Sequence, residues 1–136
     1  MDIKQYLDST YLKTAEQAGV TEEENILIAQ EFIQEAIEEN FKLIMIRPNR
    51  VALAKEMILK AKSIVQVGTV IDFPDGKSSV EDKIKEAVQA IYDGADDLDF
   101  VCNYEAFKKG DIEIVKEEVL QCTKLGLEKK KVVKWI

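Results

Sequence analysis

The stretch from Asp93 to Asn103 reads Asp-Gly-Ala-Asp-Asp-Leu-Asp-Phe-Val-Cys-Asn, and it decides how the rest of the chain is interpreted. Gly94 is typical of a residue that ends a helix, and the residues after it alternate between polar and apolar as in a strand. Residues two apart on a strand share a face, so Asp99 points away from Leu98 and Phe100. If helices cover Leu98 and Phe100, Asp99 points into an interior. A carboxylate there is costly unless it is paired or takes part in chemistry.

A second predicted strand, residues 131–136, carries the opposite charge. Lys134 lies there among Val132, Val133, Trp135 and Ile136. If the two strands are neighbours, Lys134 and Asp99 can pair across them. A buried ion pair without any catalytic role explains both residues as well. The local pattern therefore leaves a structural and a catalytic interpretation open.

Composition limits the classes of protein and partner. The chain has 136 residues, enough to bury a core of its own, and we expect residues 1–136 to form a single domain. The net charge is −7 and no basic run is longer than Lys129–Lys131, which argues against nucleic acid or an anionic membrane as the main partner. Small molecules or proteins are the expected partners.

The chemistry-bearing residue types are also restricted. There is no histidine, so the usual general base and the commonest transition-metal ligand are missing. Cys102 and Cys122 match no zinc or redox motif, and two thiols in a chain of this size favour a reducing compartment. No signal peptide and no apolar run near 18 residues is present. We therefore expect a cytoplasmic protein.

Hydrophobic periodicity predicts an α/β fold of parallel strands that alternate with helices. Asp8 and Thr10 are interpreted as capping or turn residues in the N-terminal segment. Thr21 and Glu24 form a predicted capping box that begins a long helix. Four strands are expected, at residues 42–46, 64–71, within 93–103 and at 131–136, and helices at 51–62, 80–93 and 112–125. The strands are nearly continuous apolar runs, which favours a parallel sheet with right-handed crossovers.

Three segments, in this order, resemble deoxyribose-phosphate aldolase. They are Tyr6-Leu-Asp-Ser-Thr-Tyr-Leu-Lys13, Val67-Gly-Thr-Val-Ile-Asp-Phe-Pro-Asp-Gly76 and Gly94-Ala-Asp-Asp-Leu-Asp99. The resemblance covers essentially the whole chain and implies a TIM barrel that uses neither metal nor cofactor. It implies cleavage of 2-deoxyribose 5-phosphate to glyceraldehyde 3-phosphate and acetaldehyde through a Schiff base on a lysine.

The resemblance also assigns roles to particular residues. Asp99 matches the acidic residue of the proton relay, Lys134 an auxiliary lysine beside it, and Asp8 an N-terminal aspartate that helps to hold the charge network. The cavity lining by resemblance is Thr10, Leu12, Met45, Val70 and Phe73, with Met45 where some relatives carry a cysteine. Asp72 departs from the family, in which Gly or Asn is more usual before Phe-Pro. We expect its carboxylate to alter the electrostatics of the cavity mouth.

Length is the larger departure. A TIM barrel has eight strands and typically ~250 residues, whereas four strands are expected here. The family's Schiff-base lysine and the loops that bind the substrate phosphate lie downstream of the position of Ile136. The expectation is therefore a half-barrel, four strand–helix units preceded by N-terminal helices and truncated after the fourth strand, without retro-aldol activity of its own. Imine formation on Lys134 is the less favoured outcome.

Two alternatives remain beside the aldolase interpretation. Half-barrels are expected to self-associate through open strand edges and the inward core face, because Met45, Val70 and Val101 would face water in a monomer. A flavodoxin-like regulatory module, with Asp99 as phosphoacceptor and Lys134 as its partner, ranks lowest. Such a module needs an acidic pair after its first strand, where this chain has Arg47-Pro48-Asn49.

Overall fold

A computed structural model describes residues 1–136 and divides the chain into two compact units, residues 1–68 and 69–136. Strands alternate with helices in both units, so the predicted α/β class is confirmed. Strand β3 begins in the first unit and ends in the second. The expectation of one single domain stays a prediction. None of the helices combines the length and the apolar character that crossing a membrane requires.

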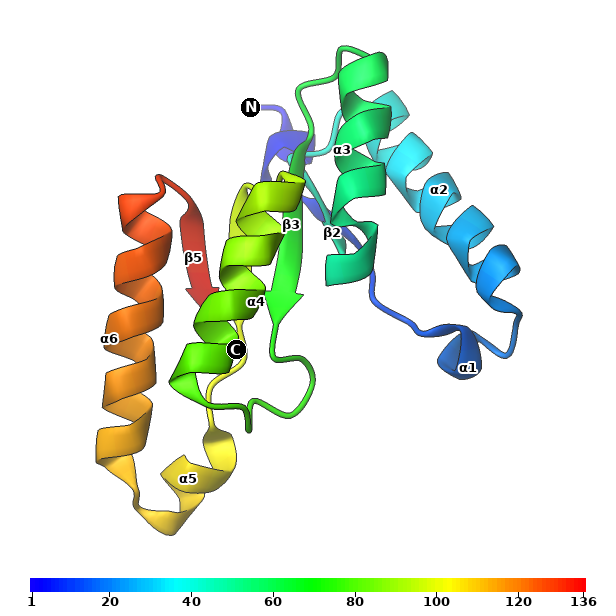
Figure 1. Ribbon diagram of the computed structural model, residues 1–136. Helices are drawn as coiled ribbons and strands as arrows, with labels where there is room; N and C mark the ends of the chain where they lie inside the picture. The colour runs from blue at the N-terminus through cyan, green and yellow to red at the C-terminus, as the bar shows by residue number, and fades with distance from the viewer. The chain divides into compact units, whose positions relative to one another are not determined.

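The first unit contains three helices, two 3-10 turns, two strands and the beginning of β3. Figure 1 shows α2 and α3 of this unit next to each other. In chain order its elements are η1 (Ile3–Tyr6), β1 (Asp8–Tyr11), α1 (Ala15–Ala18), α2 (Glu22–Glu39), β2 (Leu43–Ile46), η2 (Pro48–Arg50), α3 (Val51–Lys60) and β3 (Gln66–Ile71). The second unit continues with α4 (Val80–Asp93), β4 (Asp97–Phe100), α5 (Tyr104–Lys109), α6 (Ile112–Glu128) and β5 (Val132–Trp135).

Asp8 and Thr10 lie in strand β1, so their interpretation as capping or turn residues is wrong. The expected count of four strands is wrong for the same reason. Strand β1 pairs in parallel with β2, with Asp8 opposite Leu43 and Thr10 opposite Met45. Thr and Tyr favour strands. In β1 the backbone N–H and C=O groups bond to β2, whereas in a turn they would need side chains as partners. Tyr11 stacks on Phe32 of α2, with 4.9 Å between ring centroids. The chain therefore has five strands.

Helix α2 begins with the predicted capping box. The Thr21 hydroxyl accepts from the Glu24 amide at 3.2 Å, and the Thr21 amide donates to the Glu24 carboxylate at 2.8 Å. The helix ends at Asn40, which adopts the left-handed conformation with φ +53°. Both ends thus lie where local sequence signals place them.

In the first unit β2 lies beside both β1 and the beginning of β3. The Lys42 carbonyl, just before β2, accepts from the amide of Gln66 at 3.1 Å. In a flavodoxin-like sheet the first strand lies between the second and the third. The strand order here therefore gives no support to the flavodoxin-like alternative.

Strands β4 and β5 of the second unit pair in parallel, with Asp99 opposite Lys134 and Phe100 opposite Trp135. The Phe100 and Trp135 rings stack at 5.1 Å, and the Trp135 indole donates to the Thr123 hydroxyl of α6 at 2.9 Å. Helix α6 thus covers the face that carries the aromatic rings. The prediction that Asp99 points to the opposite face is confirmed.

The expectation that Met45, Val70 and Val101 would face water is wrong, because their exposed fractions are 5%, 2% and 4%. Met45 lies over Gly68, where an added Cβ would be 2.6 Å from its terminal methyl group. Val101 is covered by the loop between β3 and α4, at Gly76. Met45 therefore packs into the space that Gly68 leaves, and the β3–α4 loop covers Val101.

Gly76 is the tightest point of that β3–α4 loop. Its φ is +66°, and an added Cβ would overlap the carbonyl group of Cys102 at the end of β4. The loop can lie on β4 only because this residue has no side chain. The conformation and the close approach both require glycine.

We predict that Gly76→Ala lowers the free energy of unfolding by at least about 1–3 kcal/mol, the cost typical of a residue held in an unfavourable conformation. Gly19→Ala is the control, because Gly19 also has a positive φ of +69° but an added Cβ would meet nothing within 4 Å. Urea unfolding of both variants measures the difference. Equal losses for both would show that the β3–α4 loop does not lie against Cys102.

The two cysteines are free thiols in different surroundings: Cys122 is fully buried and Cys102 is partly exposed. Burial raises the pKa of the Cys122 thiol to about 11. At pH 8 only about one molecule in a thousand then carries a Cys122 thiolate, the reactive form. We predict one fast and one slow thiol with a disulfide reagent in the native protein, and two fast thiols in denaturant. Two fast thiols in the native protein would contradict this burial.

Candidate functional site

The candidate site lies on β4 and β5 of the second unit, on the face that α6 leaves uncovered. The Lys134 ammonium is 3.2 Å from the Asp99 Oδ1 atom and 3.8 Å from the Asp97 Oδ2 atom. Asp97 and Asp99 are two apart on β4 and share a face, and Lys134 is the direct neighbour of Asp99 on β5. The structure therefore brings together two of the three residues that the resemblance marks as catalytic.

Exposure differs within this triad of Asp97, Asp99 and Lys134. The Asp97 and Asp99 side chains are 7% and 14% exposed, whereas the Lys134 side chain is 38% exposed. An ammonium group that is close to carboxylates and open on one side can exchange protons with a bound molecule. The triad is thus suited to proton transfer at a partly open surface.

Sequence reasoning missed Asp97. The signal was present, because Asp97 and Asp99 have the spacing that places both carboxylates on one face of a strand. Only the pairing with β5 shows that a single lysine lies within 4 Å of both.

The first unit holds Asp8, Thr10, Leu12 and Met45 of the predicted site. Asp8 and Thr10 are exposed and share one face of β1, whereas Tyr11 on the other face packs on α2. Met45 is the direct neighbour of Thr10 on β2 and therefore lies on the same face. Leu12 follows β1 and is partly exposed. Of these four residues, the structure brings Thr10 and Met45 side by side.

Val70 and Phe73 belong to the second unit. Val70 is buried near the end of β3, and Phe73 is partly exposed in the β3–α4 loop. The residue between β3 and Phe73, Asp72, adopts the left-handed conformation with φ +58°. Gly and Asn tolerate this conformation better than most residues. Asp also adopts this conformation more often than most residues, so the loop backbone accommodates Asp72.

The Asp72 carboxylate is used inside the loop and does not lie free at a cavity mouth. It accepts from the Ser78 amide at 2.9 Å and from the Ser78 hydroxyl at 2.7 Å, and its side chain is 12% exposed. The Asp72 amide donates to the Glu86 carboxylate at 3.0 Å. Burial raises the pKa of Glu86, an effect that this hydrogen bond partly opposes.

A buried ion pair that sequence reasoning missed lies beside this loop. Lys83 of α4 and Glu118 of α6 are 0% and 1% exposed, and their charged atoms are 2.5 Å apart. The Lys83 ammonium also donates to the carbonyl groups of Gly76 at 3.1 Å and Val101 at 2.7 Å. Asp72 lies 3.5 Å away as a second carboxylate.

Glu118 extends this network to the end of β4. Its second oxygen accepts from the Asn103 amide at 2.6 Å, and the Asn103 side chain accepts from the Ala106 amide at 3.0 Å to cap α5. The network of Lys83, Glu118, Asp72 and Asn103 therefore joins both helices to the loops that follow β3 and β4. Helical spacing could have found Lys83, because it lies four and seven residues before Ala87 and Ala90 on the buried face of α4, whereas Lys85 is exposed.

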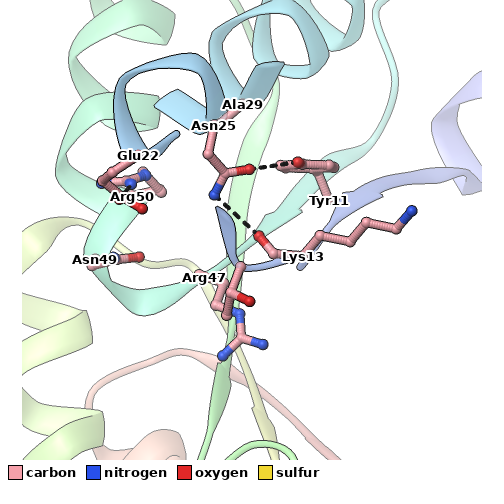
Figure 2. A pocket seen from close by; sticks show the side chains of 9 residues that line it. Tyr11, Lys13, Glu22, Asn25, Ala29, Arg47, Asn49 and Arg50 are labelled. Atoms are coloured by element: carbon pink, nitrogen blue, oxygen red, sulfur yellow. Dashed lines mark hydrogen bonds and ion pairs between the residues drawn. The ribbon is translucent and has the colours of Figure 1, made fainter. Parts of the chain in front are cut away.

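A small polar cavity of about 70 Å³ lies in the first unit. Figure 2 shows Asn25 at its centre, with its amide bound to Tyr11 and Lys13. The charged ends of Lys13 and Arg47 extend away from Asn25 in this view and do not converge on a common point. Because the groups of Asn25 already have protein partners, we interpret this cavity as part of the structure that joins β1 to α2.

No model of a protein family matches the chain. The chain is 40% identical over 136 residues to the deoxyribose-phosphate aldolase of Thermococcus gammatolerans, and it covers 57% of that protein.

Solved structures agree with this similarity. The aldolase QR15 superposes with a TM-score of 0.82 at 31% identity, over 99% of this chain and 55% of QR15. The tetrameric deoxyribose phosphate aldolase from Aeropyrum pernix superposes with a TM-score of 0.78 at 26% identity, over 98% of this chain and 51% of that protein. The chain spans about half the length of the relatives that it matches. Over its whole length the chain is therefore similar to the N-terminal half of the deoxyribose-phosphate aldolases, and its fold is that of a partial TIM barrel.

Proposed function

We propose that this chain supplies the proton-transfer half of a deoxyribose-phosphate aldolase site and does not cleave 2-deoxyribose 5-phosphate by itself. One observation carries the proposal: Lys134 and Asp99 are 3.2 Å apart on neighbouring strands of a chain with 40% identity to an aldolase. Asp99, Lys134 and Asp8 are the proposed catalytic residues. Thr10, Leu12, Met45, Val70 and Phe73 are the proposed substrate contacts.

The proposed chemistry is a retro-aldol cleavage through an imine. A lysine outside this chain adds to the substrate aldehyde, and water leaves as the protonated imine forms. The substrate's C3 hydroxyl then loses its proton and the C2–C3 bond breaks. C3 becomes the carbonyl carbon of the leaving glyceraldehyde 3-phosphate, and the electron pair of the broken bond passes into the imine to give an enamine. Protonation of the enamine carbon and hydrolysis of the imine release acetaldehyde. Asp99 and Lys134 would carry the protons of these steps.

Asp97 extends the proposal beyond the resemblance. It lies 3.8 Å from the Lys134 ammonium and is 7% exposed at its side chain. Asp97 and Asp99 both attract this ammonium from the same face of β4. Asp97 would then keep Lys134 in position while Asp99 exchanges protons.

The experiment uses a chimera in which residues 1–136 replace the matching part of the Thermococcus gammatolerans aldolase. We predict that the chimera cleaves 2-deoxyribose 5-phosphate and that the 136-residue chain does not. Asp99→Asn should lower kcat of the chimera by about 10²-fold or more, the usual contribution of an acid–base group. Asp111→Asn is the control, because Asp111 is exposed before α6 and its side chain makes no capping hydrogen bond. Equal activity of the Asp99→Asn and Asp111→Asn chimeras would refute the proposed relay.

Self-association is a second proposal, and the surface of α6 favours it. Large apolar side chains are exposed there, among them Leu120 at 67% and Leu127 at 62%. Two shallow apolar hollows meet at Val119 and Leu120 along this helix. Contiguous exposed apolar surface of this kind marks interaction sites. Self-association through the inward core face has no support, because Met45, Val70 and Val101 are buried.

We predict a mass above that of the monomer, rising with protein concentration, in light scattering after size exclusion. Leu120→Asp should shift the chain toward monomer, because it places a charge in the middle of the apolar surface. Leu59→Asp is the matched control, since Leu59 on α3 is 66% exposed outside this surface. A monomeric wild-type chain at every concentration would contradict self-association.

A further inference from the structure

We propose that Lys83 is a positioning residue of the candidate site. Its ammonium holds the β3–α4 loop, which carries Phe73, against the end of β4, which carries Asp99. The inference rests on the proposed function only where it names Phe73 and Asp99 as site residues. The clamp, meaning the contacts of Lys83 with the β3–α4 loop and with the end of β4, is itself a property of the fold.

The Lys83 ammonium is fully satisfied by protein groups. A lysine has three N–H donors, and here they face the Gly76 carbonyl at 3.1 Å, the Val101 carbonyl at 2.7 Å and the Glu118 carboxylate at 2.5 Å. Both Glu118 oxygens are also bound, one to Lys83 and one to the Asn103 amide at 2.6 Å. A buried polar network in which every member has its partners fixes a single arrangement.

The acceptors come from three separate segments of the chain. Gly76 belongs to the β3–α4 loop, Val101 follows β4, and Glu118 lies on α6. Val101 is held from both sides, because its amide donates to the Ile71 carbonyl at 3.0 Å and its carbonyl accepts from Lys83. Asp99 lies two residues before Val101, within β4. One side chain thus fixes the strand end and the loop together.

The shape of the site favours lysine over arginine. The three acceptors converge on one nitrogen atom, which suits the compact ammonium group. A guanidinium spreads its donors in a plane over several nitrogen atoms. The carboxylates of Glu118 and Asp72 both lie within 4 Å of the single Lys83 nitrogen.

A pair of variants distinguishes the positioning role of Lys83 from its contribution to the stability of the fold. Lys83→Met leaves the Glu118 carboxylate buried without its cation, which is strongly destabilising, whereas replacing both charges by apolar residues removes that penalty. The double variant Lys83→Met, Glu118→Met therefore tests whether Lys83 holds the β3–α4 loop in place, and it leaves no unpaired buried charge. Lys85→Met is the control, because the Lys85 side chain on the same helix is 78% exposed.

The experiment is amide hydrogen exchange of the intact chain, read at Gly76, whose amide donates to the Asp72 carbonyl at 2.9 Å within the loop. Urea unfolding of the same samples measures stability. We expect the double variant to be more stable than Lys83→Met and yet to exchange the Gly76 amide roughly tenfold or more faster than wild type, because the loop opens locally. Lys85→Met should exchange Gly76 at the wild-type rate.

Slow, wild-type-like exchange of Gly76 in the double variant would overturn the inference, because the loop would then hold its place without Lys83. The double variant alone decides between these outcomes, so the test remains valid if Lys83→Met does not fold. The measurement needs no catalytic activity. A failure of the clamp and a failure of the proposed aldolase function are therefore distinguishable.

Discussion

Helices cover one face of the strands, and this constraint decides where the charged side chains lie. On β4 the side chains alternate, so Leu98 and Phe100 pack under helices while Asp97 and Asp99 emerge on the other face. The next strand repeats the rule, with Trp135 bound to Thr123 of α6 and Lys134 beside the two carboxylates. One strand thus serves the core with one face and the candidate site with the other.

Lys83 and Glu118 are the exception, because they place opposite charges on the helix-covered side. Their burial is tolerated since each charged atom has hydrogen-bond partners, and breaking such a pair by removing one member typically costs about 3–5 kcal/mol. The pair reaches backbone groups after both β3 and β4. The charges under the helices and the charges on the open face are therefore linked through the same strand ends.

The sequence predicts the features that depend on local pattern. The capping box at Thr21, the alternation around Asp99 and the pairing of Asp99 with Lys134 follow from residue type and spacing, and the structure contains each of them. Features that depend on tertiary packing were missed. Strand β1 exists because β2 pairs with it, and Lys83 is buried because Gly76, Val101 and Glu118 surround it. Met45 is covered because Gly68 leaves room for it.

The central claim is that Lys134 moves protons and is not the nucleophile that forms the imine. Borohydride trapping with acetaldehyde, followed by peptide mapping, tests it in the 136-residue chain and in the chimera with the Thermococcus gammatolerans aldolase. We predict no adduct on the chain alone and an adduct in the chimera on a lysine outside residues 1–136. An adduct on Lys134 in the chain alone would contradict the account and assign the imine to this half.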